Sequence, residues 1–248
     1  MKGPVLRVEG LSKAFGGVDA VRDVSFAIAE GELVALIGPN GAGKTTCFNL
    51  VNGQLAPDAG SVSLLGSRID GLPPRAIARM GVGRTFQVAA TFGSLSAREN
   101  VQAALLSHRR LLNSFLKNAR DLLVDEADRL LGLVGMADQA ARPCNELAYG
   151  NLKRVELALA LAHRPRLLLM DEPTAGMAPD ERQELMRLAA DLARSEALAV
   201  LFTEHDVDVV FGFADRVVVL HGGEVIAAGT PQQVRSDARV QEVYLGDI

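Results

Sequence analysis

The sequence predicts an α/β fold in which helices cover a largely parallel sheet. Of the 248 residues, 48% are apolar but only 4% are aromatic and none is Trp. The core must therefore be built from Leu, Val, Ile and Ala, as in helix-covered parallel sheets. Short strand-like runs also alternate with helical patterns along the chain, which is typical of βαβ units. The length is sufficient for one large domain with a substantial core.

The expected strands are short apolar or β-branched runs bounded by Gly, Pro and other turn residues. In the first part of the chain they cover residues 5–8, 24–28, 32–37, 61–65 and 81–86. After Pro165 they cover residues 166–170, 198–202, 216–220 and 224–228, and an amphipathic helix is expected at 180–193.

The segment from about 96 to 163 differs from both flanks. Leu and Ala at helical spacing dominate it, β-branched residues are few, and Pro143 is a helix stop. We therefore expect one domain over residues 1–248, in which 1–95 and 164–248 form the core and about 96–163 form an inserted helical subdomain. Because no low-complexity linker separates the two, the helices are expected to pack on the core.

Charge and hydropathy exclude several classes of function. With 26 Lys and Arg against 30 Asp and Glu, the formal net charge is −4, and without a long basic run we expect no nucleic-acid partner. The longest unbroken apolar runs, 157–162 and 197–202, are far shorter than the roughly 20 residues that cross a bilayer. The first ten residues lack the apolar segment of a signal peptide, so a cytoplasmic location is expected.

The two cysteines give no sign of chemistry. Cys47 and Cys144 are far apart and belong to no paired spacing pattern. We expect two reduced, packed thiols.

Residues 38–45 carry the most specific motif in the chain. They read G-P-N-G-A-G-K-T, directly after the apolar run 33–37, and match the pattern of a phosphate-binding loop between a strand and a helix. Glycines let backbone N–H groups converge on phosphate oxygens, and the helix N-terminus adds partial positive charge. Lys44 is expected to reach the β- and γ-phosphates and the Thr45 hydroxyl to ligate Mg²⁺.

Acidic residues follow a second apolar strand. The run 167–170 ends in Asp171 and Glu172, which places both carboxylates at the carboxyl edge of the sheet, where ligands bind in open parallel sheets. Asp171 is expected to hold Mg²⁺ and Glu172 to polarise the attacking water. Gln87 and His205 also stand where strands should end, but a lone Gln or His at such a place is more often a surface group.

Five motifs in a fixed order resolve this ambiguity. They are the phosphate loop, Gln87, and residues 147–151 (L-A-Y-G-N), 168–173 (L-L-M-D-E-P) and 203–206 (T-E-H-D). Together they resemble the nucleotide-binding subunits of ABC transporters over essentially the whole chain. The resemblance implies the ABC ATPase fold, a P-loop NTPase core with a mixed sheet, an N-terminal antiparallel β part and an inserted helical subdomain.

The resemblance also implies roles for single residues, with ATP and Mg²⁺ as cofactors. Phe15 would stack on adenine, as suits a flat π-face, and Gln87 would sense Mg²⁺ and the membrane partner. Residues 147–151 would be the signature loop, and His205 would touch the γ-phosphate. The implied nucleotide contacts are Phe15, Gly38, Asn40, Gly41, Ala42, Gly43, Lys44, Thr45, Thr46, Gln87 and Gly150. The implied metal ligands are Thr45, Gln87 and Asp171, and the catalytic pair is Glu172 and His205.

Further motifs resemble one subfamily, the branched-chain amino acid importers. These are 15–18 (F-G-G-V), 84–87 (R-T-F-Q), the Tyr-Gly pair at 149–150, 175–177 (A-G-M), and the tail from 229–231 (G-T-P) to 244–246 (Y-L-G). The R-T-F-Q motif and the extra helical length at 107–125 are similar to the longer of the two ATPase subunits in such importers.

The signature loop departs from the commonest ABC pattern, L-S-G-G-Q. Ala148, Tyr149 and Asn151 replace three of its residues, so only Gly150 and the helix N-terminus remain as phosphate ligands. Ala178 stands where many ABC proteins carry an Asp, and a role that rests on a carboxylate there cannot be carried over.

The resemblance places the signature loop of one subunit over the ATP of another, so the working unit should be a dimer with a sister ATPase or a second copy. It also implies two membrane permease subunits as partners and a substrate-binding protein as an indirect partner. The chain would then lie peripherally on the inner face of the cell membrane. Three alternatives stay open: the ATPase of a lipid-linked glycan exporter, a soluble non-transport ABC ATPase, and a regulatory module that binds ATP without turnover. The transported solute is not determined by this sequence.

Overall fold

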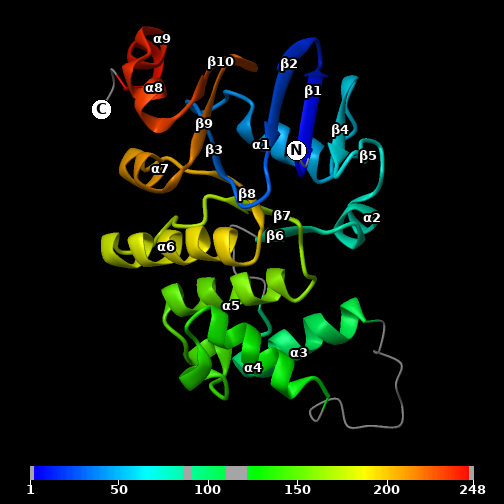
Figure 1. The fold of residues 1–248 in the computed structure, drawn as a ribbon, viewed down its shortest axis with the longest axis vertical. Helices are drawn as coiled ribbons and strands as arrows, with labels where there is room; N and C mark the ends of the chain where they lie inside the picture. The colour runs from blue at the N-terminus through cyan, green and yellow to red at the C-terminus, as the bar shows by residue number, and fades with distance from the viewer. Residues whose placement is uncertain (1–2, 86–90, 110–121, 246–248) are drawn as a thin grey trace.

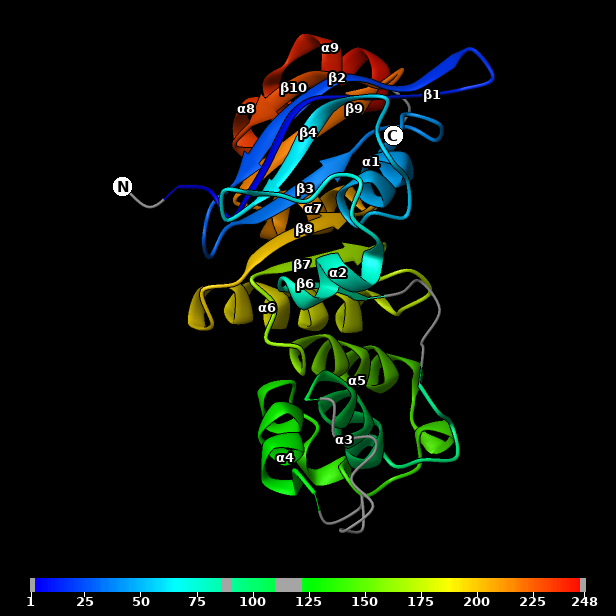
Figure 2. The ribbon, with the colours of Figure 1, turned by 90° about the vertical axis from the view of Figure 1, so that its right-hand side faces the viewer.

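The computed structural model describes residues 3–85, 91–109 and 122–245. Two sheets occupy the upper half of the molecule in Figure 1, and a group of helices occupies the lower end. The turned view in Figure 2 shows the same succession along the long axis. The α/β class expected from the sequence is confirmed.

The smaller sheet is antiparallel and has the strand order β2-β1-β4-β5. Its strands are β1 (Leu6–Phe15), β2 (Val18–Ile28), β4 (Ala59–Leu64) and β5 (Ser67–Arg68). The first two are much longer than the runs 5–8 and 24–28 that the sequence predicted, so those boundaries were wrong. The missed residues, 9–15 and 18–23, mix polar and apolar types, and most of them are partly or fully exposed. Their pairing continues through register shifts in the β1–β2 ladder, which leave no apolar alternation to read.

The larger sheet has the order β10-β9-β3-β8-β7-β6. All its pairings are parallel except that of β9 with β10, so the expected mixed sheet is confirmed. The strands are β3 (Leu33–Ile37), β6 (Val82–Thr85), β7 (Leu167–Asp171), β8 (Ala199–Thr203), β9 (Arg216–His221) and β10 (Glu224–Gly229).

Two apolar cores lie on the two faces of this sheet. In β3 every residue is buried: Leu33, Ala35 and Ile37 belong to one core, and Val34 and Leu36 to the other. This explains why the strand reads as a continuous apolar run rather than an alternating one. The second core also contains Phe48 and Leu50 of α1, which lies between the two sheets.

The helices fall into two groups. Around the sheets lie α1 (Lys44–Val51), α2 (Pro74–Arg79), α6 (Pro179–Ser195), α7 (Val207–Phe213), α8 (Pro231–Ser236), α9 (Ala238–Val240) and a π-helical turn, η4 (Gln241–Leu245). At the lower end lie α3 (Ala97–His108), α4 (Val124–Leu133), α5 (Tyr149–Leu161) and the short turns η2 (Ala137–Gln139) and η3 (Cys144–Glu146).

The lower helices share the first core with the sheet. That core runs without a break from Ile37 and Phe202 through Met186 of α6 to Val155 of α5 and Val101 of α3. A capping box fixes the start of α3, since Ser96 and Glu99 exchange side-chain and backbone hydrogen bonds. The helical group is therefore packed against α6 and the sheet, as expected.

Both thiols are buried. Cys47 of α1 is fully inaccessible, and burial raises its pKa to about 12. Cys144 is 1% exposed, and burial raises its pKa as well. Neither forms a disulfide.

Across the described ranges, we find no helix with the length and apolar character needed to cross a bilayer.

Phe202, in the middle of β8, is 0% exposed and belongs to the core shared by sheet and helices. We expect Phe202→Ala to lower the free energy of unfolding by about 3–5 kcal/mol, because the lost burial is added to the cost of a cavity. Urea titration followed by circular dichroism measures this. Val18→Ala, at a position 70% exposed, is the control and should change the free energy of unfolding by less than about 0.5 kcal/mol. Equal effects in the two variants would contradict this view of the core.

Candidate functional site

The loop 38–45 connects β3 to α1, as the motif predicted. Helix α1 begins at Lys44 with Gly43 as its N-cap. Within the described residues, no side chain caps this helix and no acidic residue lies in its first turn. The first N–H groups of the helix thus lack the side-chain partner that usually satisfies them, which is the condition for binding an anion.

Two glycines allow the loop to take its path. Gly38 has a φ of 148°, and a Cβ there would lie 2.1 Å from the Leu220 carbonyl oxygen. Gly43 has a φ of 102°, and a Cβ there would lie 2.3 Å from the Ala20 carbonyl oxygen. The loop is therefore held between the end of β9 and the strand β2, and a side chain at either position would displace it.

Lys44 lies within the curve of this loop. Its ammonium donates to the carbonyl oxygens of Gly38 at 2.5 Å and Pro39 at 3.1 Å, and the residue is 8% exposed. Burial lowers the pKa of Lys44, while the negative charges of Glu172 and Asp171 oppose that shift. The two carboxylates therefore lie near enough to Lys44 for their charges to act on it.

The carboxyl ends of β7 and β8 hold the acidic residues. Asp171 pairs with Thr203 in the parallel ladder, and the Thr203 hydroxyl donates to Asp171 Oδ1 at 2.8 Å. The same hydroxyl oxygen accepts the Glu172 N–H at 3.0 Å. Arg84 of β6 forms an ion pair with Asp171 Oδ2 at 3.3 Å. Sequence reasoning assigned no role to Thr203 or Arg84 individually, because each acts on a residue far away in the chain.

Glu172 has a left-handed backbone with a φ of 46°, a conformation that costs a non-Gly residue about 1–3 kcal/mol. Its N–H is held by the hydroxyl and the carbonyl oxygen of Thr203. Its Oε1 lies 2.9 Å from His205 Nε2. The two residues that the sequence singled out as a catalytic pair are thus in hydrogen-bond contact, and they can share a proton.

A buried carboxylate, Glu204, links the loops that carry this pair. It is 4% exposed. Its Oε1 accepts the backbone N–H of Thr174 at 2.9 Å and the Thr174 hydroxyl at 2.6 Å, and its Oε2 accepts the N–H of His205 at 3.2 Å. Three donors thus satisfy a charge that would otherwise be costly to bury. Glu204 belongs to the motif 203–206 but was given no role from the sequence. The available signal was an acidic residue shortly after the apolar run 197–202.

These residues fit a nucleoside triphosphate with a divalent cation. The loop offers backbone amides, Lys44 offers a cation, and the exposed Thr45 hydroxyl and the Asp171 carboxylate are oxygen ligands of the kind that Mg²⁺ prefers. Thr46 follows in the first turn of α1, and Gly41 lies at an exposed point of the loop, where a Cβ would have no atom within 4 Å. Asn40 and Ala42 complete the loop, the first exposed and the second buried.

Two other predicted residues lie on other elements, β1 and α5. Phe15 is 47% exposed at the end of β1, with Lys13 Nζ 5.7 Å from its ring centroid. Gly150 lies in the first turn of α5, and a Cβ there would come within 2.9 Å of Glu181 Oε1. In both ribbon views α5 lies below α6, whereas α1, which follows the phosphate loop, lies well above α6 among the sheets. Gln87 lies outside the described residues.

Two of the four departures from the common ABC motifs occupy N-caps. Ala148 precedes α5, and Ala178 precedes α6. The Ala178 N–H donates to Glu181 Oε2 at 3.3 Å, so Glu181 supplies the carboxylate that bonds the N-cap of α6.

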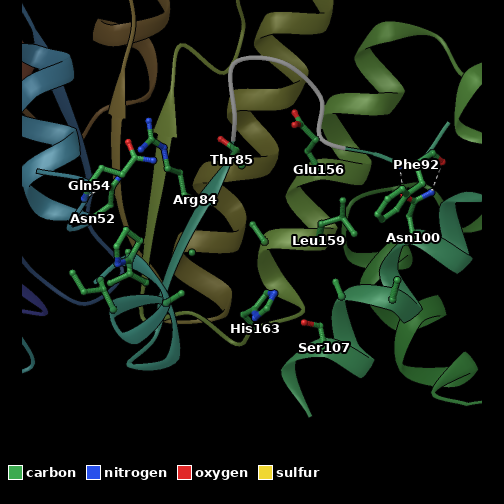
Figure 3. Close-up of a pocket in the computed structure, with 18 residues that line it drawn as sticks. Asn52, Gln54, Arg84, Thr85, Phe92, Asn100, Ser107, Glu156, Leu159 and His163 are labelled. Carbon is green, nitrogen blue, oxygen red and sulfur yellow. Dashed lines mark hydrogen bonds between the residues drawn. The ribbon is translucent and has the colours of Figure 1, made fainter. Parts of the chain in front are cut away.

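A cavity of about 630 Å³ lies between β6 and α2 on one side and the lower helices on the other, next to the place where α5 packs on β6. Figure 3 shows Arg84 and Thr85 on its sheet side and Leu159, His163 and Ser107 on its helical side. At one end stands Phe92, which is 65% exposed. Its backbone N–H and carbonyl group are both hydrogen-bonded to the Asn100 side chain, at 2.8 and 3.1 Å.

Comparison with known families gives two matches. Residues 21–175 match the family described as ABC transporter. Residues 224–247 match the family described as branched-chain amino acid ATP-binding cassette transporter.

Individual proteins are similar along the whole chain. LivG of Salmonella typhimurium, a high-affinity branched-chain amino acid transport ATP-binding protein, is 39% identical and is covered completely in both directions. LptB of Acidithiobacillus ferridurans, a lipopolysaccharide export ATP-binding protein, is 40% identical over 98% of this chain and 97% of its own. The crystal structure of MJ1267, an ATP-binding cassette in its ADP conformation, has a TM-score of 0.88 at 29% identity, with 98% of this chain and 99% of that one covered.

Replacing Lys44 by Ala should weaken ATP binding by about 10- to 100-fold, because a charge-assisted contact to the phosphates is lost. Isothermal titration calorimetry of the isolated chain measures the dissociation constant. Arg194→Ala is the control, since Arg194 pairs with Asp215 on the surface and should leave affinity unchanged. An unaltered affinity in the Lys44 variant would remove the phosphate assignment of loop 38–45.

Glu204→Gln should loosen the loop that carries His205. A glutamine keeps the shape but turns one acceptor into a donor, which cannot receive all three hydrogen bonds. We expect the His205 amide to exchange its hydrogen about tenfold faster, as measured by native-state hydrogen exchange. Glu224→Gln alters only a surface pair with Arg22 and should leave that rate unchanged. Unchanged protection at His205 in the Glu204 variant would show that the loop is held by other contacts.

Proposed function

The chain belongs to the ABC transporter family as one of its ATP-binding subunits, and on that premise we propose that it hydrolyses ATP to power the uptake of branched-chain amino acids or related small polar solutes through separate membrane subunits. The carrying observation is the convergence of the loop 38–45, Asp171 and the hydrogen-bonded pair Glu172–His205 at one edge of the sheet. The importer assignment is supported by the similarity to LivG and by the branched-chain match over 224–247.

The phosphate loop and the residues around it would bind the nucleotide through several groups. Backbone N–H groups of Gly38 and of residues 40–43, together with those of Thr45 and Thr46, would hold the phosphate oxygens; Pro39 has no N–H to offer. Lys44 would exchange its present carbonyl partners for the β- and γ-phosphates, which suits a compact, buried cation. Phe15 would stack on the adenine ring. Mg²⁺ bound by Thr45, Asp171 and Gln87 would neutralise charge on the phosphates.

Glu172 and His205 would carry out hydrolysis. Glu172 Oε1 would orient the attacking water and accept its proton, a role that needs a carboxylate held in a fixed direction. The left-handed backbone at Glu172 and its contact with His205 provide that direction. His205 would donate to the γ-phosphate from its position beside the same carboxylate.

A dimer would complete the site. Since α5 begins below α6, on the far side of the sheet from α1, Gly150 would serve the nucleotide of a second copy or of a sister ATPase. Without a serine hydroxyl at Ala148, the Gly150 N–H and the positive end of α5 would supply the contact. ATP would then join two surfaces that hydrolysis separates, which is a population shift driven by differential affinity.

The cavity between β6 and the lower helices would receive the membrane partner. Its lining is largely apolar and includes the exposed Phe92, the kind of surface on which an amphipathic helix docks. Residues 96–163 would act as one helical unit and transmit the ATP-driven motion from there. The partners would be two permease subunits, contacted at the inner face of the cell membrane. A substrate-binding protein would deliver the solute to these permeases.

The similarity to LptB favours a second candidate, an ATPase for export of a lipid-linked glycan. Co-purification of the tagged chain from its native membrane distinguishes the two candidates. Permeases of an importer with a binding protein support the proposal, whereas exporter membrane subunits overturn it.

Glu172→Gln should trap the ATP-bound dimer, because the variant keeps the side-chain shape but loses the base that activates water. Size-exclusion chromatography with ATP and Mg²⁺ should show more dimer for this variant than for wild type, and monomer for both with ADP. The run is repeated with the sister ATPase present.

The matched control is Glu196→Gln, an exposed residue after α6, which should behave as wild type. Wild-type hydrolysis by the Glu172 variant in both formats would show that the reaction does not depend on this carboxylate.

A further inference from the structure

Arg84 occupies a position between the cavity and the acidic residues. It belongs to β6, the edge strand of the large sheet, where it pairs with Leu169 of β7. Its side chain is 18% exposed. Figure 3 shows it extending from β6 on the sheet side of the cavity, next to Asn52 and Gln54.

The guanidinium joins two parts of the nucleotide site. Nη2 lies 3.3 Å from Asp171 Oδ2, and Nη1 lies 3.2 Å from Asn49 Oδ1. Asn49 belongs to α1, the helix that begins at the phosphate loop. A planar fork with several donors can hold both partners at once, whereas an ammonium cannot.

Asp171 has a partner on each of its oxygens. Oδ1 accepts the Thr203 hydroxyl at 2.8 Å, and Oδ2 meets Arg84. The guanidinium therefore occupies the position beside Asp171 Oδ2 that a metal cation would need, whether Asp171 bound that cation directly or through water. Two positive charges at one carboxylate oxygen repel each other, so the cation and Arg84 compete for it.

We infer that Arg84 is a positioning residue that sets the affinity of Asp171 for Mg²⁺ according to the occupancy of the cavity. Without metal, Arg84 neutralises Asp171 and ties it to α1. A membrane-subunit helix that presents an acidic side chain to Arg84 from the cavity would draw the guanidinium toward itself and free Oδ2 for the cation. This inference rests on the proposed function, in which Asp171 holds Mg²⁺ and the cavity holds the membrane partner.

Linkage makes the coupling reciprocal. If docking raises Mg²⁺ affinity by some factor, Mg²⁺ with nucleotide raises docking affinity by the same factor. An assembled transporter would then load its nucleotide site more readily than a free subunit. Arg84 would give the chain a means of limiting metal binding away from the membrane.

The test is a titration of Mg²⁺ at constant AMP-PNP, a non-hydrolysed ATP analogue, with the melting temperature of the isolated chain as the readout. Arg84→Met keeps the aliphatic stem in the cavity wall and removes the competing charge. We expect its Mg²⁺ midpoint to fall about fivefold below that of wild type, the size of a weak allosteric coupling. Arg84→Lys should show a smaller fall in the same direction.

Arg68→Met provides the matched control, because Arg68 also pairs with an aspartate, Asp70, on the antiparallel sheet; its midpoint should equal that of wild type. An unchanged or raised midpoint in folded Arg84→Met overturns the inference. If that variant does not fold, Arg84→Lys decides in the same way. A wild-type chain that shows no Mg²⁺-dependent stabilisation by the analogue instead overturns the proposed function.

The same titration of the co-purified transporter tests whether occupancy of the cavity changes the affinity for Mg²⁺. The wild-type midpoint should be about fivefold lower in the assembly than in the free chain, while Arg84→Met should give one midpoint in both. A wild-type midpoint that assembly does not move, or an equal shift in the variant, overturns the coupling.

Discussion

The parallel pairing of β7 with β8 is the constraint on which the site depends. It sets Asp171 opposite Thr203, and a single hydroxyl then bonds both the Asp171 carboxylate and the Glu172 backbone. A one-residue slip would turn every side chain of β7 to the other face and take Asp171 out of register with Thr203. Because both faces of the sheet are apolar, alternation does not oppose that slip; the close packing of side chains of different size against the two cores does.

What the sequence could predict follows from how local each signal is. The loop 38–45 and the acids after β7 are short motifs whose chemistry needs only a strand end, and both lie where their pattern indicated. Arg84 and Glu204 are different, because their meaning depends on partners 87 and 30 positions away. The full length of β1 and β2 could not be predicted either, since the extra residues pair through backbone hydrogen bonds and show a mixture of polar and apolar side chains, most of them partly or fully exposed.

The sheet core and the helical end share one apolar core on one side and leave a cavity between them on the other. One core joins β8, α6, α5 and α3 without interruption. A displacement of the helices therefore changes the packing against the sheet. Beside β6 a cavity lies between the same two parts, although α5 still packs on β6. Packing is thus continuous on one side and looser on the other.

The burial of both cysteines protects the chain's thiols from oxidation. Oxidation and alkylation need an accessible thiolate, and neither Cys47 nor Cys144 offers one. An oxidant should therefore leave the phosphate loop unmodified, even though Cys47 lies only three residues beyond Lys44. The same property makes the natural chain a ready background for site-directed labelling, because a single cysteine introduced on the surface would react alone.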